Sequence, residues 1–253
     1  MSVATHTLDI PGVALVYDVL GPLPTSDGRP PLLMIGQPMD ATGFATLASR
    51  FPDRTVVTYD PRGLGRSTRT DGRVDNAPEV QAADVHALIE ALGAGPVDIF
   101  GSSGGAVTAL ALVAAHPDDV VTLVAHEPPL IPVLPDAGDA EHARAEVRDA
   151  YEAKGWGTGM AAFMVLSSWR GEYTDDYFAH PAPDPAAFGM PTGDDGSRAR
   201  PAGCGLPEPP RWVPRRRVRL CRSAGGLRAP PPRGPRRRSR VGEQPSIPDT
   251  CRA

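Results

Sequence analysis

Apolar and polar residues alternate over residues 5–10, and a largely apolar run covers residues 13–20 after the turn signal Pro11-Gly12. This pattern predicts an antiparallel β-hairpin. Short apolar and β-branched runs then predict buried strands, and apolar positions at helical spacing between them predict helices. The strands are expected at residues 32–35, 55–59, 97–100 and 120–125, with a break from Gly36 to Asp40, and the helices at residues 42–51, 78–92 and 106–115. Strands that alternate with helices indicate an α/β fold with a mostly parallel, doubly wound sheet.

The pattern changes after residue 135. A polar, charged helix is expected over residues 139–154 and an apolar-faced helix over residues 160–169, which together suggest a helical cap inserted after a core strand. We therefore expect a core over residues 1–130, a cap over residues 131–196 and a tail over residues 197–253. The large apolar side chains of the cap either line an apolar pocket or only pack the cap onto the core; they are Trp156, Phe163, Met164, Trp169, Tyr173 and Phe178.

The tail differs from the rest of the chain in composition. Residues 197–253 contain fifteen arginines, no lysine, three acidic residues and eleven prolines, although the whole chain has a net charge of −4. So little apolar surface cannot offset the entropy of ordering the chain, which predicts a disordered tail and a sheet without its last strands. Two explanations stay open. The tail is a basic arm for nucleic acid or another acidic partner, or it is the product of a shifted reading frame near residues 195–202.

One stretch carries candidate chemistry. The run Gly101-Ser102-Ser103-Gly104-Gly105 follows a predicted strand and precedes a predicted helix, and this context turns Gly-x-Ser-x-Gly into a nucleophile elbow. Ser103 is then the candidate nucleophile, and the backbone N–H of Gly104 is a candidate oxyanion donor at a helix N-terminus. Gly101 and Gly105 leave space for the tight crossing of strand and helix. The alternative is a glycine-rich turn with two exposed serines.

Together these features resemble the α/β-hydrolase family over residues 5–191. The resemblance rests on the elbow, on the loop Asp60-Pro61-Arg62-Gly63-Leu64-Gly65-Arg66-Ser67, and on Ile35-Gly36-Gln37, where the family commonly has His-Gly-x. It implies a serine hydrolase that cleaves small ester-type or amide-type substrates through an acyl-enzyme on Ser103, without a metal or a cofactor. It also implies that Gln37 supplies the second oxyanion donor and that Gly36, Asp60 and Arg62 are structural.

The general base is not where the resemblance places it. The family order is nucleophile, acid, histidine, but no histidine follows His180 in this chain. Glu127, at the end of a predicted strand, is a candidate acid, and His126 beside it is a candidate substitute base. Two function hypotheses therefore stand: a serine hydrolase crippled by the loss of its histidine, and an inactive hydrolase-like binding module whose basic tail takes nucleic acid or another acidic partner.

The remaining features exclude several other classes. No apolar run reaches the length of a membrane span, and residues 1–6 lack the pattern of a signal peptide, so we expect a cytoplasmic protein without a membrane partner. The three cysteines, Cys204, Cys221 and Cys251, show no metal-ligand spacing. We expect no metal and no cofactor, and a small-molecule substrate as the partner, with nucleic acid added only if the tail is a genuine basic arm.

Overall fold

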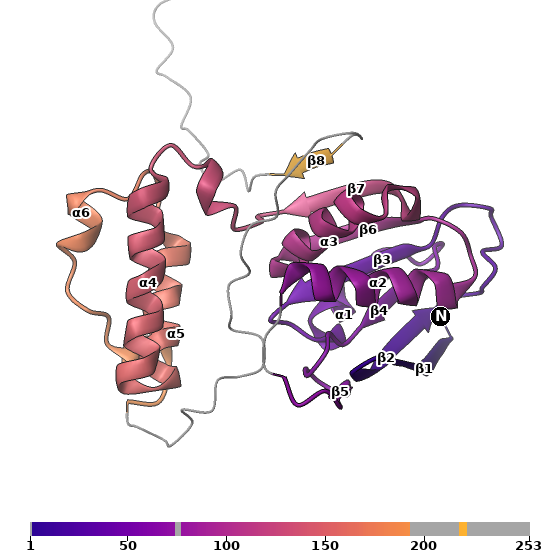
Figure 1. Ribbon diagram of the computed structural model, residues 1–253, viewed down its shortest axis with the longest axis horizontal. Helices are drawn as coiled ribbons and strands as arrows, with labels where there is room; N and C mark the ends of the chain where they lie inside the picture. The colour runs from indigo at the N-terminus through magenta and orange to yellow at the C-terminus, as the bar shows by residue number, and fades with distance from the viewer. Residues whose placement is uncertain (1, 74–76, 193–217, 222–253) are drawn as a thin grey trace, which may run out of the picture. The chain divides into compact units, whose positions relative to one another are not determined.

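The structure, a computed structural model, describes residues 2–73 and 77–192, together with the backbone of residues 218–221. One mixed sheet runs through it in the order β1-β2-β4-β3-β6-β7-β8, and the short strand β5 pairs with β2 (Figure 1). The strands are β1 (Val3–Ile10), β2 (Val13–Leu20), β3 (Leu32–Gln37), β4 (Val56–Tyr59), β5 (Thr68–Arg69), β6 (Val97–Ser103), β7 (Val120–His126) and β8 (Val218–Cys221).

Strand directions follow the predicted pattern. The β1–β2 hairpin is antiparallel, and β2 pairs antiparallel with β4 and β5. All other pairs, from β4 through β3, β6 and β7 to β8, are parallel. The prediction of a mostly parallel α/β sheet is therefore confirmed. The chain leaves β3 toward β4 on one side and leaves β6 toward β7 on the other, so the two connections diverge between β3 and β6. Such a switch point is where open α/β sheets place their ligand sites.

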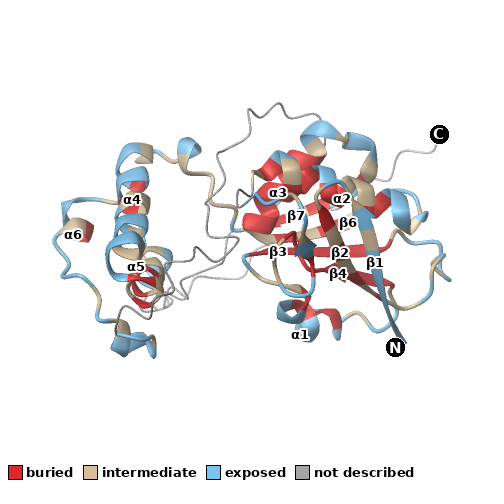
Figure 2. Cartoon of the chain, turned by 60° about the horizontal axis from the view of Figure 1, so that its bottom comes forward, coloured by how far each residue is buried: buried red, intermediate tan, exposed pale blue. Residues whose placement is uncertain are grey.

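Helices connect the strands and cover the sheet. In the core they are η1 (Ala41–Phe44), α1 (Ala45–Ala48), α2 (Pro78–Leu92), α3 (Gly104–Ala115) and η2 (Pro117–Asp119). Alternation along the strands divides the core in two: Leu33 and Ile35 join the cluster that includes residues of α2 and α3, whereas Leu32 and Met34 join the cluster of η1 and α1. Buried residues accordingly concentrate on the central strands and on α3 (Figure 2).

Two strand predictions need correction. Gly36 and Gln37 do not break β3, because they continue its pairing opposite Ser102 and Ser103 of β6. The prediction that the sheet ends at β7 is also wrong for four residues of the tail. Strand β8 pairs in parallel with β7, whose backbone would otherwise present unpaired N–H and C=O groups at the edge. The rest of the predicted tail lies outside the described residues.

The helical segment after β7 contains η3 (Ile131–Val133), α4 (Ala137–Lys154), α5 (Trp156–Ser168), α6 (Asp175–Phe178) and η4 (Pro185–Phe188). Helices α4 and α5 approach closely because Gly159 has no side chain, and a Cβ there would lie 2.6 Å from the Cβ of Tyr151. Trp169, Tyr173 and Phe178 all make edge-to-face ring contacts with Tyr177. These aromatic side chains therefore pack the segment itself. The division into core and cap stays a prediction, and every residue of both ranges belongs to one compact unit, Met1–Ser223.

No described helix is both long enough and apolar enough to cross a membrane.

Candidate active site

The predicted nucleophile lies on a strained turn between a strand and a helix. Strand β6 ends at Ser103 and α3 begins at Gly104. Ser103 has φ of +54° and ψ of −125°, a backbone conformation that residues with a side chain rarely adopt. Such strain costs about 1–3 kcal/mol and persists only where the surrounding structure enforces it. The backbone geometry is that expected of a nucleophile elbow.

Close packing of α3 on the strands enforces this turn. A Cβ on Gly105 would lie 2.3 Å from the backbone oxygen of Ile35, and a Cβ on Gly101 would lie 2.9 Å from the Cα of Ala106. Neither neighbour is a flexible side chain, so a larger residue at either position would push the helix away from the sheet. The crossing of the strand and the helix therefore has no room for a side chain at either position.

The two predicted oxyanion donors lie next to one another, because Gln37 ends β3 and Gly104 begins α3 directly after the neighbouring strand β6. Gln37 is the register partner of Ser103, and a Cβ on Gly104 would lie 3.1 Å from the Cβ of Gln37. Gln37 and Gly104 are both buried. The N–H of Gly104 belongs to the first turn of α3, where backbone donors have no partner within the helix and the helix dipole favours negative charge. The structure thus brings Ser103, Gly104 and Gln37 together at the switch point of the sheet.

The candidate substitute base, His126, contacts the neighbouring serine. Its Nδ1 lies 3.3 Å from the Oγ of Ser102, its register partner on β6, and its ring stacks on Phe100 at a centroid distance of 5.9 Å. Successive strand residues point to opposite faces of a sheet. His126 therefore shares a face with Ser102, whereas Ser103 follows at the turn.

The candidate acid, Glu127, follows β7 directly. It is exposed and has φ of +48°. Strands β6 and β7 are parallel, and Ser102 is paired with His126. Glu127 therefore occupies the position after the last pair on β7, as Ser103 does on β6. It stands at the same sheet edge as Ser103.

Asp60 organises the loop after β4. Its carboxylate accepts hydrogen bonds from the backbone N–H of Ala41 at 2.9 Å, the backbone N–H of Arg66 at 2.8 Å and the Nε–H of Arg66 at 2.8 Å. Burial acts to raise the pKa of Asp60, but these hydrogen bonds outweigh it and hold the pKa below its ordinary value. Arg66 also binds Asp18 on β2. Through these contacts the loop after β4 is tied to η1 and to β2.

Arg62 forms the buried ion pair of this region. Its Nε–H donates to Asp84 on α2 at 2.7 Å, and its Nη1–H donates to Asp71 at 3.2 Å. Burial raises the pKa of Asp84, against the opposing effect of Arg62. The pair ties the loop to α2. Sequence analysis missed Asp84, although its place one turn before Leu88 on the apolar face of α2 signals a buried carboxylate that needs a partner.

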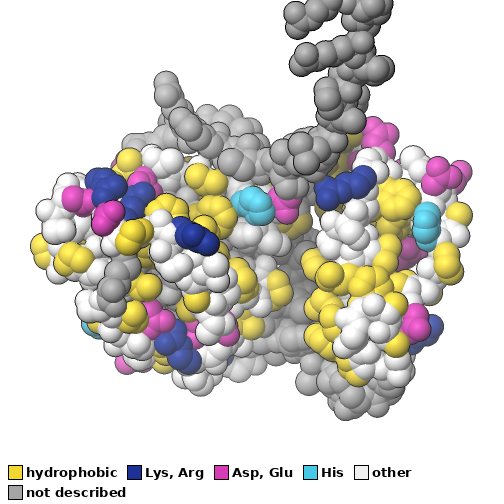
Figure 3. All heavy atoms as spheres, turned by 180° about the vertical axis from the view of Figure 1, so that it is seen from behind, with side chains coloured by type: hydrophobic (Ala, Val, Ile, Leu, Met, Phe, Trp, Pro, Cys, Tyr) yellow, Lys and Arg dark blue, Asp and Glu magenta, His cyan; other side chains and the backbone are white. Residues whose placement is uncertain are grey.

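Charges of both signs lie next to one another on the surface shown in Figure 3. Three of the acidic–basic pairs of the described core are Arg29–Asp27, Arg54–Asp98 and Arg66–Asp18.

Comparison with known proteins agrees with this geometry. Residues 37–155 match the family described as alpha/beta hydrolase fold. The chain is 36% identical over 135 residues to the uncharacterized hydrolase YraK of Bacillus subtilis (strain 168), covering 53% of this chain and 48% of YraK. It is 35% identical over 100 residues to a proline iminopeptidase of Xylella fastidiosa (strain 9a5c), covering 38% of this chain and 31% of that protein.

A solved structure shares the fold. An alpha/beta hydrolase enzyme from a Medee basin deep-sea metagenome library superposes with a TM-score of 0.50 at 18% identity, covering 63% of this chain and 55% of that one. The chain therefore has an alpha/beta hydrolase fold, and residues 37–155 match the family of that name. It spans about half the length of YraK and about a third of the length of the iminopeptidase.

Proposed function

We propose that this protein is a serine hydrolase that cleaves small ester-type or amide-type substrates through an acyl-enzyme on Ser103. The observation that carries the proposal is the conformation of Ser103, with φ of +54° at the junction of β6 and α3. A side chain held in this way at the start of a helix projects from the backbone toward a reactant. The hydrolase relatives support the reaction class.

The reaction assigns a step to each residue. The Oγ of Ser103 attacks the substrate carbonyl carbon while its proton passes to a base, and the carbonyl oxygen becomes an oxyanion. The backbone N–H groups of Gly104 and Gln37 stabilise that oxyanion. The alcohol or amine then leaves with a proton, and water hydrolyses the remaining ester on Ser103. No step uses a metal or a cofactor.

The base is the weak part of the site. His126 binds Ser102, and Glu127 alone is a poor base for a hydroxyl group. We infer that the 253-residue chain acylates with activated esters but turns over slowly. Oxyanion stabilisation and substrate binding alone keep a rate enhancement of about 10³–10⁴ over water in a serine hydrolase without its triad. His126 serves as a substitute base only if its ring turns from Ser102 to Ser103.

The test is hydrolysis of p-nitrophenyl acetate by the purified chain, with proline p-nitroanilide as a second substrate suggested by the iminopeptidase relative. Release of p-nitrophenol is expected as a burst of about one equivalent followed by a slow phase. Ser103→Ala should abolish the burst. Ser102→Ala is the matched control, because it removes the same hydroxyl one residue away and should keep the burst. A burst that survives in Ser103→Ala contradicts the proposal.

A second function rests on the composition of residues 197–253, with their fifteen arginines. A hydrolase-like scaffold would then bind nucleic acid or another acidic partner through this segment, which lies largely outside the described residues. Removal of residues 197–253 should abolish a salt-sensitive gel shift of single-stranded DNA. Absence of a gel shift by the full chain at low salt contradicts this alternative.

A further inference from the structure

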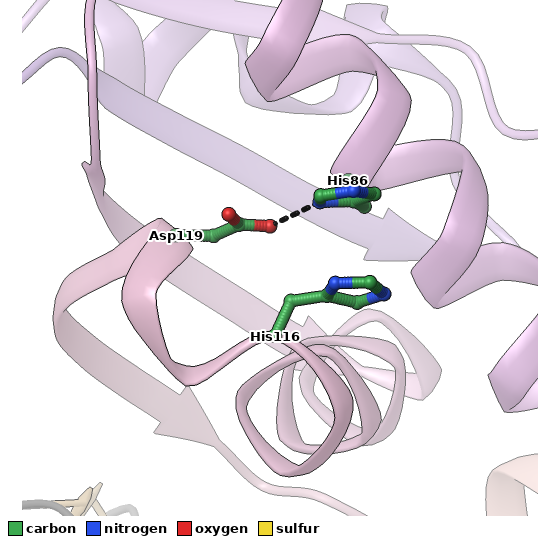
Figure 4. A group of neighbouring side chains, drawn as sticks. All are labelled: His86, His116 and Asp119. Carbon is green, nitrogen blue, oxygen red and sulfur yellow. Dashed lines mark hydrogen bonds and ion pairs between the residues drawn. The ribbon is translucent and has the colours of Figure 1, made fainter.

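Two histidines and an aspartate meet far from the elbow. His86 lies on α2, His116 ends α3 and Asp119 closes η2 (Figure 4). One ligand atom from each lies within 4.8 Å of the others, and all three residues are partly buried. Their order in the sequence hides this grouping, because His86 and His116 are thirty positions apart.

The contacts within the group are specific. The Nδ1 of His86 lies 2.6 Å from the Oδ2 of Asp119, and the rings of His86 and His116 stack with centroids 3.7 Å apart and planes inclined by 12°. Glu90, one turn after His86 on α2, places its Oε1 3.7 Å from the Nε2 of His86. Two imidazoles thus lie face to face, and two carboxylates contact the ring of His86.

The charge around the group favours a cation. Helix α2, helix α3 and the segment from His116 to Asp119 contain no lysine and no arginine, but they hold Glu79, Asp84, Glu90, Asp118 and Asp119. Asp84 is paired with Arg62, whereas Asp119 and Glu90 both contact His86. Imidazole and carboxylate together are ligands that Zn²⁺ takes readily.

We propose that His86, His116 and Asp119 form a binding site for a divalent transition-metal ion of the Zn²⁺ class. The ion takes the place of the proton between His86 and Asp119, and that proton leaves to solvent. In the stacked arrangement the nitrogen lone pairs of the two rings lie in parallel planes and do not converge on one ion. One of the rings therefore turns about its Cβ–Cγ bond when the ion binds. Water completes the coordination, since a His₂Asp set supplies three ligands and Zn²⁺ takes four.

The role of such an ion is structural. It joins α2 to the connection between α3 and β7, two parts of the core that also meet through helix packing and through the contact of His86 with Asp119. The site lies at the opposite end of α3 from Ser103, a helix length of about 18 Å at 1.5 Å per residue. The ion therefore takes no part in the acylation of Ser103, and the two proposals fail or stand independently. A metal that binds only the folded state raises its stability by mass action.

The experiment is calorimetric titration of Zn²⁺ into the full chain without a histidine tag at neutral pH. The background carries Cys204→Ser, Cys221→Ser and Cys251→Ser, so that thiolates cannot supply the binding. We expect one ion per chain, and at least a tenfold loss of affinity in His86→Gln and in His116→Gln. The matched control is His142→Gln on α4, because His142 also has a glutamate one turn away, with its Nε2 3.9 Å from the Oε1 of Glu146.

A second readout covers variants that fold poorly. Zn²⁺ should raise the thermal midpoint of the background protein and of His142→Gln, and should leave that of Asp119→Asn unchanged, with circular dichroism confirming that each variant is folded. No Zn²⁺ binding by the background protein overturns the proposal. Loss of affinity that is equal in His142→Gln and His86→Gln overturns it as well.

Discussion

Ser103 and Glu127 are the two residues other than glycine that have a positive φ in the described part of the chain. They lie side by side at the carboxyl ends of two neighbouring parallel strands, because Ser103 ends β6 and Glu127 comes directly after β7. Backbone strain in this sheet is thus concentrated at the edge where Gly104 and Gln37, the proposed oxyanion donors, also lie. This concentration supports a reactive site there more directly than the Gly-x-Ser-x-Gly motif alone.

Strain at Ser103 predicts an unusual effect of glycine. Ser103→Gly should raise the free energy of unfolding by about 1 kcal/mol, because glycine adopts a positive φ without steric cost. Ser102→Gly, on the regular part of β6, should lower it by about 1 kcal/mol, because a glycine in a strand weakens it and the contact with His126 is lost. Urea denaturation of both variants measures the difference. Destabilisation by Ser103→Gly would show that the turn is unstrained.

The crossing of α3 and β3 should not tolerate a methyl group. In Gly105→Ala the new Cβ would lie 2.3 Å from the backbone oxygen of Ile35, so we expect a loss of about 3 kcal/mol or more in the free energy of unfolding. Gly138→Ala is the control, since no atom lies within 4 Å of a Cβ at that position on α4. That variant should be as stable as the parent or slightly more stable. Equal urea midpoints for the two variants would contradict the packing described here.

Asp60 should make the fold sensitive to acid. Its pKa in the folded state lies below the unfolded value, so its contribution to stability is present above pH of about 4 and is lost as the pH falls through the folded pKa. Asp60→Asn should lower the free energy of unfolding by about 2 kcal/mol at neutral pH and flatten its decline in acid. Denaturation series from neutral to acidic pH test this, with exposed Asp53→Asn as control. Parallel pH profiles for Asp60→Asn and the parent would rule out this role.

The buried ion pair predicts a large cost when one partner is removed. Arg62→Met leaves the carboxylate of Asp84 buried without its guanidinium, and we expect a loss of about 3–5 kcal/mol in the free energy of unfolding. Arg62→Met combined with Asp84→Asn should recover part of that loss. Arg144→Met, which breaks a more exposed pair with Glu141, should cost at most about 1 kcal/mol. A small effect of Arg62→Met would mean that Asp84 has another compensating partner.

Much of the core could be predicted from local pattern. The hairpin, the helix over residues 78–92 and the elbow at Ser103 follow from period, turn residues and glycine spacing, each of which acts over a few neighbouring positions. The strand over residues 32–35 was predicted too short, because Gly36 and Gln37 have weak strand propensity and extend β3 only through pairing with β6. Propensity yields to tertiary pairing at such positions.

Contacts between distant residues could not be predicted. The pairing of Arg62 with Asp84, the contact of His126 with Ser102 and the meeting of His86 with His116 all join different elements. Each depends on the register of the sheet and on the packing of its helices, which no local spacing encodes. The short strand β8 was missed for the same reason. It forms by pairing with β7, and the composition of its segment alone does not indicate a strand.

The identity of the nucleophile is tested most directly by covalent labelling. The full chain is treated with a fluorophosphonate, which reacts with activated serine hydroxyls, and the labelled peptide is mapped by mass spectrometry. We predict one label per chain, on Ser103, present in Ser102→Ala and absent in Ser103→Ala. A label on Ser102, or an unmodified chain whose fold is confirmed by circular dichroism, would contradict the account.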